Sequence, residues 1–169
     1  MRITELFTAQ SIALDEAQQD RSQIIDRLVE LQATHGNIRD KEAYKKGLYE
    51  REDEGSTYVD NGITVPHAKC DCVTRPSLAA LRLKTPVQYN PDDDGKTDLL
   101  FAIAAPKNGS LHVDMLARMM QMLMNEDFVE KLRTAKTPED FLAAIDAQEE
   151  AQFGDESFTD QEIEQAGYR

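Results

Sequence analysis

The sequence contains no tryptophan, only two cysteines and only three histidines among its 169 residues. Cys70 and Cys72 are too few to form a disulfide framework, and we expect both thiols to stay reduced inside a cell. Because histidine is scarce, any imidazole chemistry must involve His35, His67 or His112.

The sequence also lacks a continuous apolar run of the ~20 residues that a membrane-spanning helix requires. Its N-terminal segment contains no uninterrupted apolar stretch of the kind found in a secretory signal. These absences predict a cytoplasmic protein that does not insert directly into a membrane.

Basic residues are also scarce. The sequence has 19 lysines and arginines against 32 aspartates and glutamates, which gives a net charge of −13. Proteins that bind nucleic acid neutralise its phosphates with clustered basic side chains, so this balance argues against DNA or RNA as a partner. An acidic surface suits a basic protein partner instead.

The acidic charge is concentrated at the C-terminal end of the sequence. Residues 149–169 contain seven acidic side chains and one arginine, and they lack a sustained apolar face. Such a composition is typical of a solvated segment. We therefore expect one domain over residues 1–148, which is an ordinary domain size, followed by an acidic linker or tail over residues 149–169.

Helical periodicity is clear in two segments of the N-terminal third. The first segment follows an N-cap at Asp20 or Ser22, carries apolar residues at helical spacing, and stops at Gly36. The second runs from its cap at Asp40 to Gly55. Both are predicted to be amphipathic helices.

The middle of the sequence carries strand signals, and the remainder is helical again. β-Branched residues at 57–65 are interrupted by Asn61-Gly62, a strong signal for a hairpin turn. Short apolar runs at 78–83 and 99–104 predict two more strands, and residues 111–145 predict three helices. This order predicts an α/β or α+β sandwich in which helices cover both faces of one sheet.

His67 follows the apolar segment Ile63-Thr64-Val65 and is held in place by Pro66. Reactive groups in open α/β sheets gather where strands end, because the backbone there is exposed while its anchor is rigid. His67 is therefore a candidate nucleophile, although a histidine at such a position can equally serve to fill a turn.

His112 lies in the first turn of the helix expected after residue 110. The free N–H groups and the positive dipole end of a helix N-terminus favour phosphate and keep a nearby imidazole neutral. A neutral imidazole can attack phosphorus or contact a phosphoryl oxygen, whereas a protonated one cannot attack. The alternative is a surface residue at a helix start, where polar residues are common.

His35 and Arg51 complete the set of basic candidates. His35 lies beside Gly36 at a predicted helix C-terminus, where a partly charged imidazole complements the helix dipole, so we expect a structural role. Arg51 offers a planar fork of donors that matches phosphate oxygens, and it stays charged throughout a reaction. It joins a phosphate site only if the fold brings it to His67.

Two other kinds of site, a zinc site and a cysteine–histidine catalytic pair, could be formed from some of the same residues. His67, Cys70, Cys72 and His112 supply two nitrogens and two sulfurs for zinc, but Cys-x-Cys is tighter than the usual Cys-x2-Cys spacing and no second paired motif exists. A cysteine nucleophile with a histidine base is also available, without a local signature to support it. We expect neither a metal nor a cofactor at this site.

Taken together, these segments resemble enzyme IIA of the fructose and mannitol class (type 2) of the bacterial phosphoenolpyruvate-dependent sugar phosphotransferase system. Arg51-Glu52, Ser56-Thr57 and the run from Gly62 to His67 are similar to the active-site stretch of that family. Ala105-Pro106 with Leu111-His112 and the helix that follows are similar to the segment that bears the auxiliary histidine. The likeness covers roughly residues 1–148.

The resemblance implies a three-layer α/β/α sandwich with a mixed parallel and antiparallel sheet and helices on both faces. It implies that His67 accepts a phosphoryl group from the carrier protein HPr and passes it to the IIB component of a fructose- or mannitol-class sugar permease. His112 and Arg51 would assist, and residues 149–169 would lead into a IIB domain in a longer protein. The alternative function is a regulatory module of the same fold that signals its phosphorylation state by binding other proteins.

Overall fold

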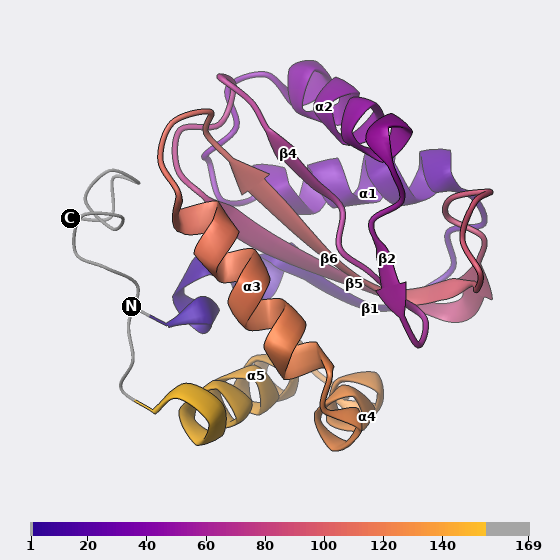
Figure 1. The fold of residues 1–169 in the computed structure, drawn as a ribbon, viewed down its shortest axis with the longest axis vertical. Helices are drawn as coiled ribbons and strands as arrows, with labels where there is room; N and C mark the ends of the chain where they lie inside the picture. Colours follow the sequence, from indigo (N-terminus) through magenta and orange to yellow (C-terminus); the bar gives the residue numbers. More distant parts are fainter. Residues whose placement is uncertain (1, 155–169) are drawn as a thin grey trace.

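The computed structural model describes residues 2–154, and within them one six-stranded sheet lies between two layers of helices (Figure 1). The strands are β1 (Ile12–Glu16), β2 (Tyr58–Asp60), β3 (Ile63–Thr64), β4 (His67–Lys69), β5 (Ser77–Val87) and β6 (Thr97–Ala105). The α-helices are α1 (Arg21–Ala33), α2 (Lys41–Glu54), α3 (Leu111–Leu123), α4 (Glu126–Thr134) and α5 (Pro138–Phe153). Two short 3-10 turns, η1 (Ile3–Leu6) and η2 (Ala9–Ser11), precede β1.

The sheet is mixed, as expected. Its strand order is β1-β5-β6-β3-β2, and β4 pairs with β6 beyond the end of β3. The pairs β1–β5, β3–β6 and β4–β6 are parallel, whereas β5–β6 and β2–β3 are antiparallel. Both β3 and β4 thus lie along the same side of β6, with a short break between them.

The two central strands, β5 and β6, are buried on both faces, which explains their continuous apolar sequences. On β5, Leu78 and Ala80 belong to the core under α3, α4 and α5, while Ala79 and Leu81 belong to the core under α1 and α2. This alternation follows the two-residue period of a strand. The expected three-layer α/β/α sandwich is confirmed.

Side-chain caps set the starts of the helices where the sequence predicted them. Asp20, rather than Ser22, caps α1 by accepting the backbone N–H of Gln23 at 2.9 Å, and Asp40 caps α2 by accepting that of Ala43 at 3.1 Å. The predicted hairpin turn is also present, since Asn61 and Gly62 both have positive φ angles, 52° and 79°.

Both central strands are longer than predicted, since β6 covers Thr97–Ala105 where residues 99–104 were expected, and β5 extends further still. β5 was expected to end at residue 83 because Pro86 lacks a backbone donor, yet it continues to Val87. The pairing with β6 is irregular between Arg82 and Val87, so Pro86 falls where the regular ladder is interrupted.

The expectation of two free thiols was wrong, because Cys70 and Cys72 are joined by a disulfide. The chain turns tightly after β4 and brings the two Cα atoms within 5.0 Å of each other. That separation lies within the range that a disulfide can bridge.

The predicted boundary between residues 148 and 149 falls inside α5, which continues to Phe153. Glu149 is fully buried, where its carboxylate accepts a hydrogen bond from Arg118 on α3 at 2.8 Å and another from the backbone N–H of Ile3 at 2.9 Å. The helix therefore continues into the charge-rich segment, where Arg118 neutralises the buried carboxylate of Glu149. Residues 155–169 of the predicted tail lie outside the described residues.

Within residues 2–154, no helix combines the length and the apolar character that crossing a bilayer would take.

We predict that Glu149→Ala destabilises the fold by about 3–5 kcal/mol, because it leaves the buried Arg118 guanidinium without this carboxylate. Urea unfolding followed by circular dichroism measures the change. Glu150→Ala is the matched control, since Glu150 is 61% exposed and its pair with Arg2 lies at the surface; it should cost about 1 kcal/mol or less. Equal losses in the two variants would contradict the role of Glu149.

Candidate functional site

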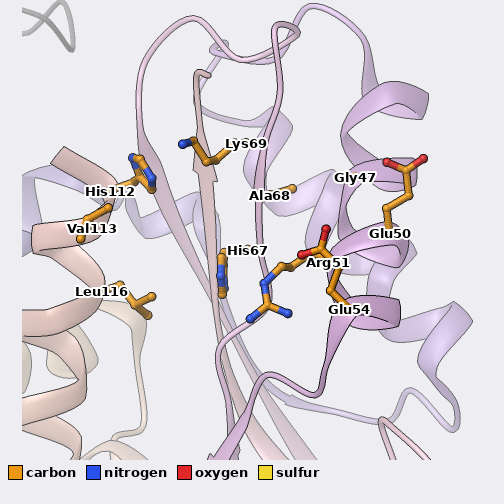
Figure 2. Close-up of a pocket in the computed structure, with 10 residues that line it drawn as sticks. All are labelled: Gly47, Glu50, Arg51, Glu54, His67, Ala68, Lys69, His112, Val113 and Leu116. Carbon is orange, nitrogen blue, oxygen red and sulfur yellow. The ribbon is translucent and has the colours of Figure 1, made fainter. Parts of the chain in front are cut away.

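A cleft of about 430 Å³ opens between α2, β4 and the start of α3 (Figure 2). The lining residues come from α2, from α3 and from β4. Figure 1 shows that α2 and α3 belong to the helix layers on opposite faces of the sheet, with β4 between them. The lining residues are Gly47, Glu50, Arg51, Glu54, His67, Ala68, Lys69, His112, Val113 and Leu116. The cleft thus contains all three residues that the sequence assigned to one site: His67, His112 and Arg51.

His67 is the first residue of β4, and it pairs with Ile103 of β6. The sequence placed it in a loop after a strand, but the chain resumes its pairing at once after the two-residue break Val65-Pro66. The backbone N–H of Ile103 donates to the Pro66 carbonyl at 2.9 Å, which holds the break against β6. His67 is therefore held by regular sheet structure and is more rigidly placed than predicted.

One hydrogen bond determines which ring nitrogen of His67 carries the proton. Nδ1 lies 2.9 Å from the backbone carbonyl oxygen of Val65. A carbonyl oxygen can only accept, so Nδ1–H is the donor, and in the neutral ring Nε2 keeps its lone pair. The carbonyl of the strand break thereby leaves Nε2 with the lone pair that a nucleophile needs.

Burial keeps the His67 ring neutral. It lowers the pKa of His67 below 6.5, and the nearby Arg51 guanidinium lowers that pKa further, while the hydrogen bond to Val65 opposes both effects. The outcome is an imidazole that is unprotonated at neutral pH and able to act as a nucleophile.

His112 lies in the first turn of α3, as predicted. Burial lowers the pKa of His112, and the charges of Lys69 and His67 lower it further. Figure 2 shows both histidines on the same cleft, with the Lys69 side chain pointing toward His112. A neutral ring here can contact an anion without repelling the cations around it.

Arg51 enters the cleft from the last turn of α2. Its Nη1 donates to the Gly55 carbonyl at 2.9 Å, which bends the side chain across the helix end toward His67. The fold therefore brings the Arg51 guanidinium to the His67 imidazole, which the sequence alone did not establish.

The sequence analysis did not single out Lys69, which lines the cleft, and it did not give the role of Glu52, which lies beside the lining residues. Lys69 lies two positions after His67 on the same strand, so the strand period turns both side chains to the same face. Glu52 is buried and holds the segment after α2, accepting from the Thr57 backbone N–H at 2.9 Å, the Thr57 hydroxyl at 2.7 Å and the Asn90 amide at 3.0 Å. The two-residue spacing from His67 was a signal from which the position of Lys69 could have been predicted. The buried position of Glu52 depends on its hydrogen bond with Asn90, which is distant in sequence.

Gly47 explains how α2 comes so close to the floor of the cleft. A Cβ atom at this position would lie 3.1 Å from the Cβ of Ala68 on β4. Glycine normally weakens a helix interior, and here it permits a close approach between the helix and the strand that carries His67.

His35 lies away from the cleft, just beyond the end of α1. Its Nε2 lies 2.8 Å from the Leu78 carbonyl, so the ring ties α1 to β5 and has a structural role. Burial lowers the pKa of His35, which disfavours the partial charge expected at the helix end.

The zinc alternative fails on the chemistry of its ligands. Thiolates bind zinc, and both sulfurs of the Cys-x-Cys pair are bonded to each other. The same bond removes the cysteine nucleophile of the second alternative. Across residues 2–154, no group of three or more histidine, cysteine or acidic side chains is arranged to hold a metal.

The comparison with protein families matches residues 5–148 to the model described as "Phosphoenolpyruvate-dependent sugar phosphotransferase system, EIIA 2". The fructose-specific EIIA component of Haloferax volcanii is 34% identical over 152 residues, covering 86% of this chain and 99% of that protein. The fructose-specific EIIABC component of Bacillus subtilis is 33% identical over 146 residues, covering 86% of this chain but 23% of that protein. This chain thus spans about a quarter of the length of the Bacillus relative.

Solved structures share the fold. The nitrogen regulatory protein IIA-Ntr of Neisseria meningitidis superposes with a TM-score of 0.79 at 22% identity, covering 85% of this chain and 98% of that one. The mannitol enzyme IIA of Escherichia coli, solved in complex with phosphorylated mannitol enzyme IIB, gives a TM-score of 0.72 at 20% identity, covering 83% and 97%.

We predict that Arg51→Gln raises the pKa of His67, because the guanidinium disfavours the protonated ring. The measurement is an NMR titration of the histidine ring C–H signals. In the unaltered chain the His67 signal should titrate below 6.5, so protonation, which blocks attack, begins only at acidic pH. His35 is the internal control and should not shift; an unchanged His67 pKa in the variant would contradict the contact.

Proposed function

The chain belongs to the EIIA type 2 family of the phosphoenolpyruvate-dependent sugar phosphotransferase system, and on that basis we propose that it carries a phosphoryl group on Nε2 of His67. Components of this system transfer phosphoryl groups. The observation that carries the proposal is the hydrogen bond from Nδ1 of His67 to the Val65 carbonyl, which leaves a lone pair on Nε2.

The proposed donor is the phosphohistidine of HPr. Neutral His67 attacks the phosphorus with Nε2, a P–N bond forms, and the P–N bond of the donor breaks so that its imidazole leaves. Positive charge develops on the His67 ring, and the Val65 carbonyl stabilises it through the Nδ1 proton, which stays in place. Because the entering and leaving groups are both imidazoles, the step needs neither a metal nor a nucleotide.

The surrounding side chains position the phosphoryl group during its transfer. Arg51 and Lys69 offset the negative charge of the phosphoryl oxygens, and His112 orients them from the first turn of α3. Glu50 and Glu54 line the α2 side of the same cleft. Their charges oppose a dianion, so they favour release of the group to an acceptor.

The proposed acceptor is the IIB component of a fructose- or mannitol-class permease, and the proposed setting is the cytoplasm. The Bacillus relative carries A, B and C components by name in one protein, and the mannitol neighbour was solved with its IIB partner. The net charge of −13 suits steering toward a basic donor, an effect that fades as salt increases.

A regulatory role is the second candidate, and the fold similarity to a nitrogen regulatory protein favours it. The two roles differ in where the phosphoryl group goes. Sugar phosphorylation after mixing with enzyme I, HPr and the IIB and IIC components supports transport. A phosphorylated chain that binds a regulator but never supplies IIB supports signalling.

We predict that His67→Gln abolishes phosphorylation by phosphoenolpyruvate, enzyme I and HPr. In the unaltered chain the label should reach one phosphate per molecule and be acid-labile and base-stable, as expected for a phosphoramidate. His35→Gln is the matched control, because the glutamine amide can still donate to the Leu78 carbonyl and the cleft is untouched; it should label fully. Full labelling of His67→Gln would overturn the proposal.

We further predict that His112→Gln and Lys69→Gln each slow transfer roughly ten- to hundredfold without reducing the final amount of label, since each removes a contact to the phosphoryl group. Quenched-flow phosphorylation by phospho-HPr measures the rate. Lys84→Gln is the control, since Lys84 is exposed on β5 and does not line the cleft. Complete loss of label in a folded His112→Gln variant would instead make His112 an acceptor.

A further inference from the structure

We propose that Cys70 and Cys72 form a reversible dithiol–disulfide site that exchanges with low-molecular-weight thiols and modulates phosphoryl transfer in the neighbouring cleft. The modulation rests on the proposed function, whereas the exchange chemistry does not. The site lies directly after Lys69, the last residue of β4, and no part of the phosphoryl-transfer mechanism above uses it.

The disulfide is poorly suited to a purely structural role. A disulfide stabilises a fold chiefly by restricting the unfolded chain, and this effect grows with the length of the loop that it closes. Here the bonded residues are two apart in sequence, so the closed loop is as short as a Cys-x-Cys pair allows. A cross-link that restricts so little of the chain points to chemistry at the sulfurs.

The local contacts assign different roles to the two sulfurs. Cys72 is 7% exposed, whereas Cys70 is only partly buried, so an external thiol reaches Cys70 first. The backbone N–H of Cys72 donates to Sγ of Cys70 at 3.1 Å. In the reduced form this donor stabilises negative charge on Cys70, which favours its reactive thiolate.

The exchange balances without any further reactant. In the oxidising direction, the Cys70 thiolate attacks a small disulfide, forms a mixed disulfide and releases one small thiol. The Cys72 thiolate then attacks Sγ of Cys70 and releases the second small thiol, so two protein thiols and one small disulfide become one protein disulfide and two small thiols. The reverse sequence reduces the pair.

Backbone hydrogen bonds hold the chain at both ends of the ring that the Cys70–Cys72 disulfide closes. The N–H of Cys70 donates to the Ala105 carbonyl at the end of β6 at 2.9 Å, and the Cys72 carbonyl accepts the N–H of Arg39 at 2.7 Å. Between them, Asp71 pairs with Lys107 at 3.5 Å, on the segment that leads from β6 to α3. Opening the ring therefore loosens a connection between the end of β4 and the approach to His112.

The effect on the cleft follows from this placement. Lys69 precedes the ring by one residue and points toward His112 (Figure 2). Reduction removes the covalent cross-link directly after Lys69 and leaves the turn held by the backbone hydrogen bonds of Cys70 and Cys72 alone. The ammonium group of Lys69 is then held less firmly in the cleft. His67 is farther from the ring and is held by Ile103 and the Val65 carbonyl, so it should still accept the phosphoryl group.

The exchange is tested by equilibrating the folded chain in graded mixtures of reduced and oxidised glutathione, quenching with acid, and counting free thiols with a maleimide that shifts gel mobility. We expect one transition between no label and two labels while the circular dichroism spectrum stays folded. Two labels in every mixture, or no label until the chain unfolds, would overturn the site.

The coupling is tested by comparing the rate of phosphorylation by phospho-HPr before and after reduction. We expect the reduced chain to be slower by about threefold to tenfold, a coupling of ordinary size. The folded double variant Cys70→Ser/Cys72→Ser should be as slow as the reduced chain and should not respond to glutathione. Equal rates in the two redox states, with full labelling in both, would overturn the coupling. Absence of labelling in both states would instead contradict the function of His67, and the thiol count would remain an independent readout.

Discussion

Three residues of β4 pair in parallel with the end of β6, and the cleft depends on this short ladder. It sets His67 opposite Ile103, turns Lys69 to the same face, and leaves a two-residue break in which the Val65 carbonyl reaches back to Nδ1 of His67. A loop of the same composition would leave the ring free to rotate. Sheet pairing therefore gives His67 a fixed ring orientation and a defined tautomer.

Charge in the cleft is arranged around that neutral ring. Burial lowers the pKa values of both His67 and His112, while Arg51 and Lys69 supply positive charge on either side of them. Burial disfavours the charged form of both imidazoles, so the positive charge in the cleft comes from the Arg51 guanidinium and the Lys69 ammonium group. This arrangement is the one that the proposed phosphoryl transfer requires, with an uncharged nucleophile beside fixed positive charge.

The wall of the cleft formed by α3 is held in place from outside the site. Arg118 on α3 pairs with the buried carboxylate of Glu149 on α5, which also accepts the backbone N–H of Ile3. The end of α5 and the start of the chain thus support the helix whose first turn carries His112. An acid that looked like part of a solvated tail is a structural element of the domain.

Local patterns in the sequence determined the caps of α1 and α2, the Asn61-Gly62 turn and the continuously apolar central strands, because each depends on neighbours in the chain. They also singled out His67, His112 and Arg51. Only the tertiary structure decided that these three side chains meet, that Val65 fixes the tautomer of His67, that Cys70 and Cys72 are bonded, and that Glu52 and Glu149 are buried. Those outcomes depend on contacts between segments far apart in the sequence, or on an exact backbone geometry that residue types alone do not specify.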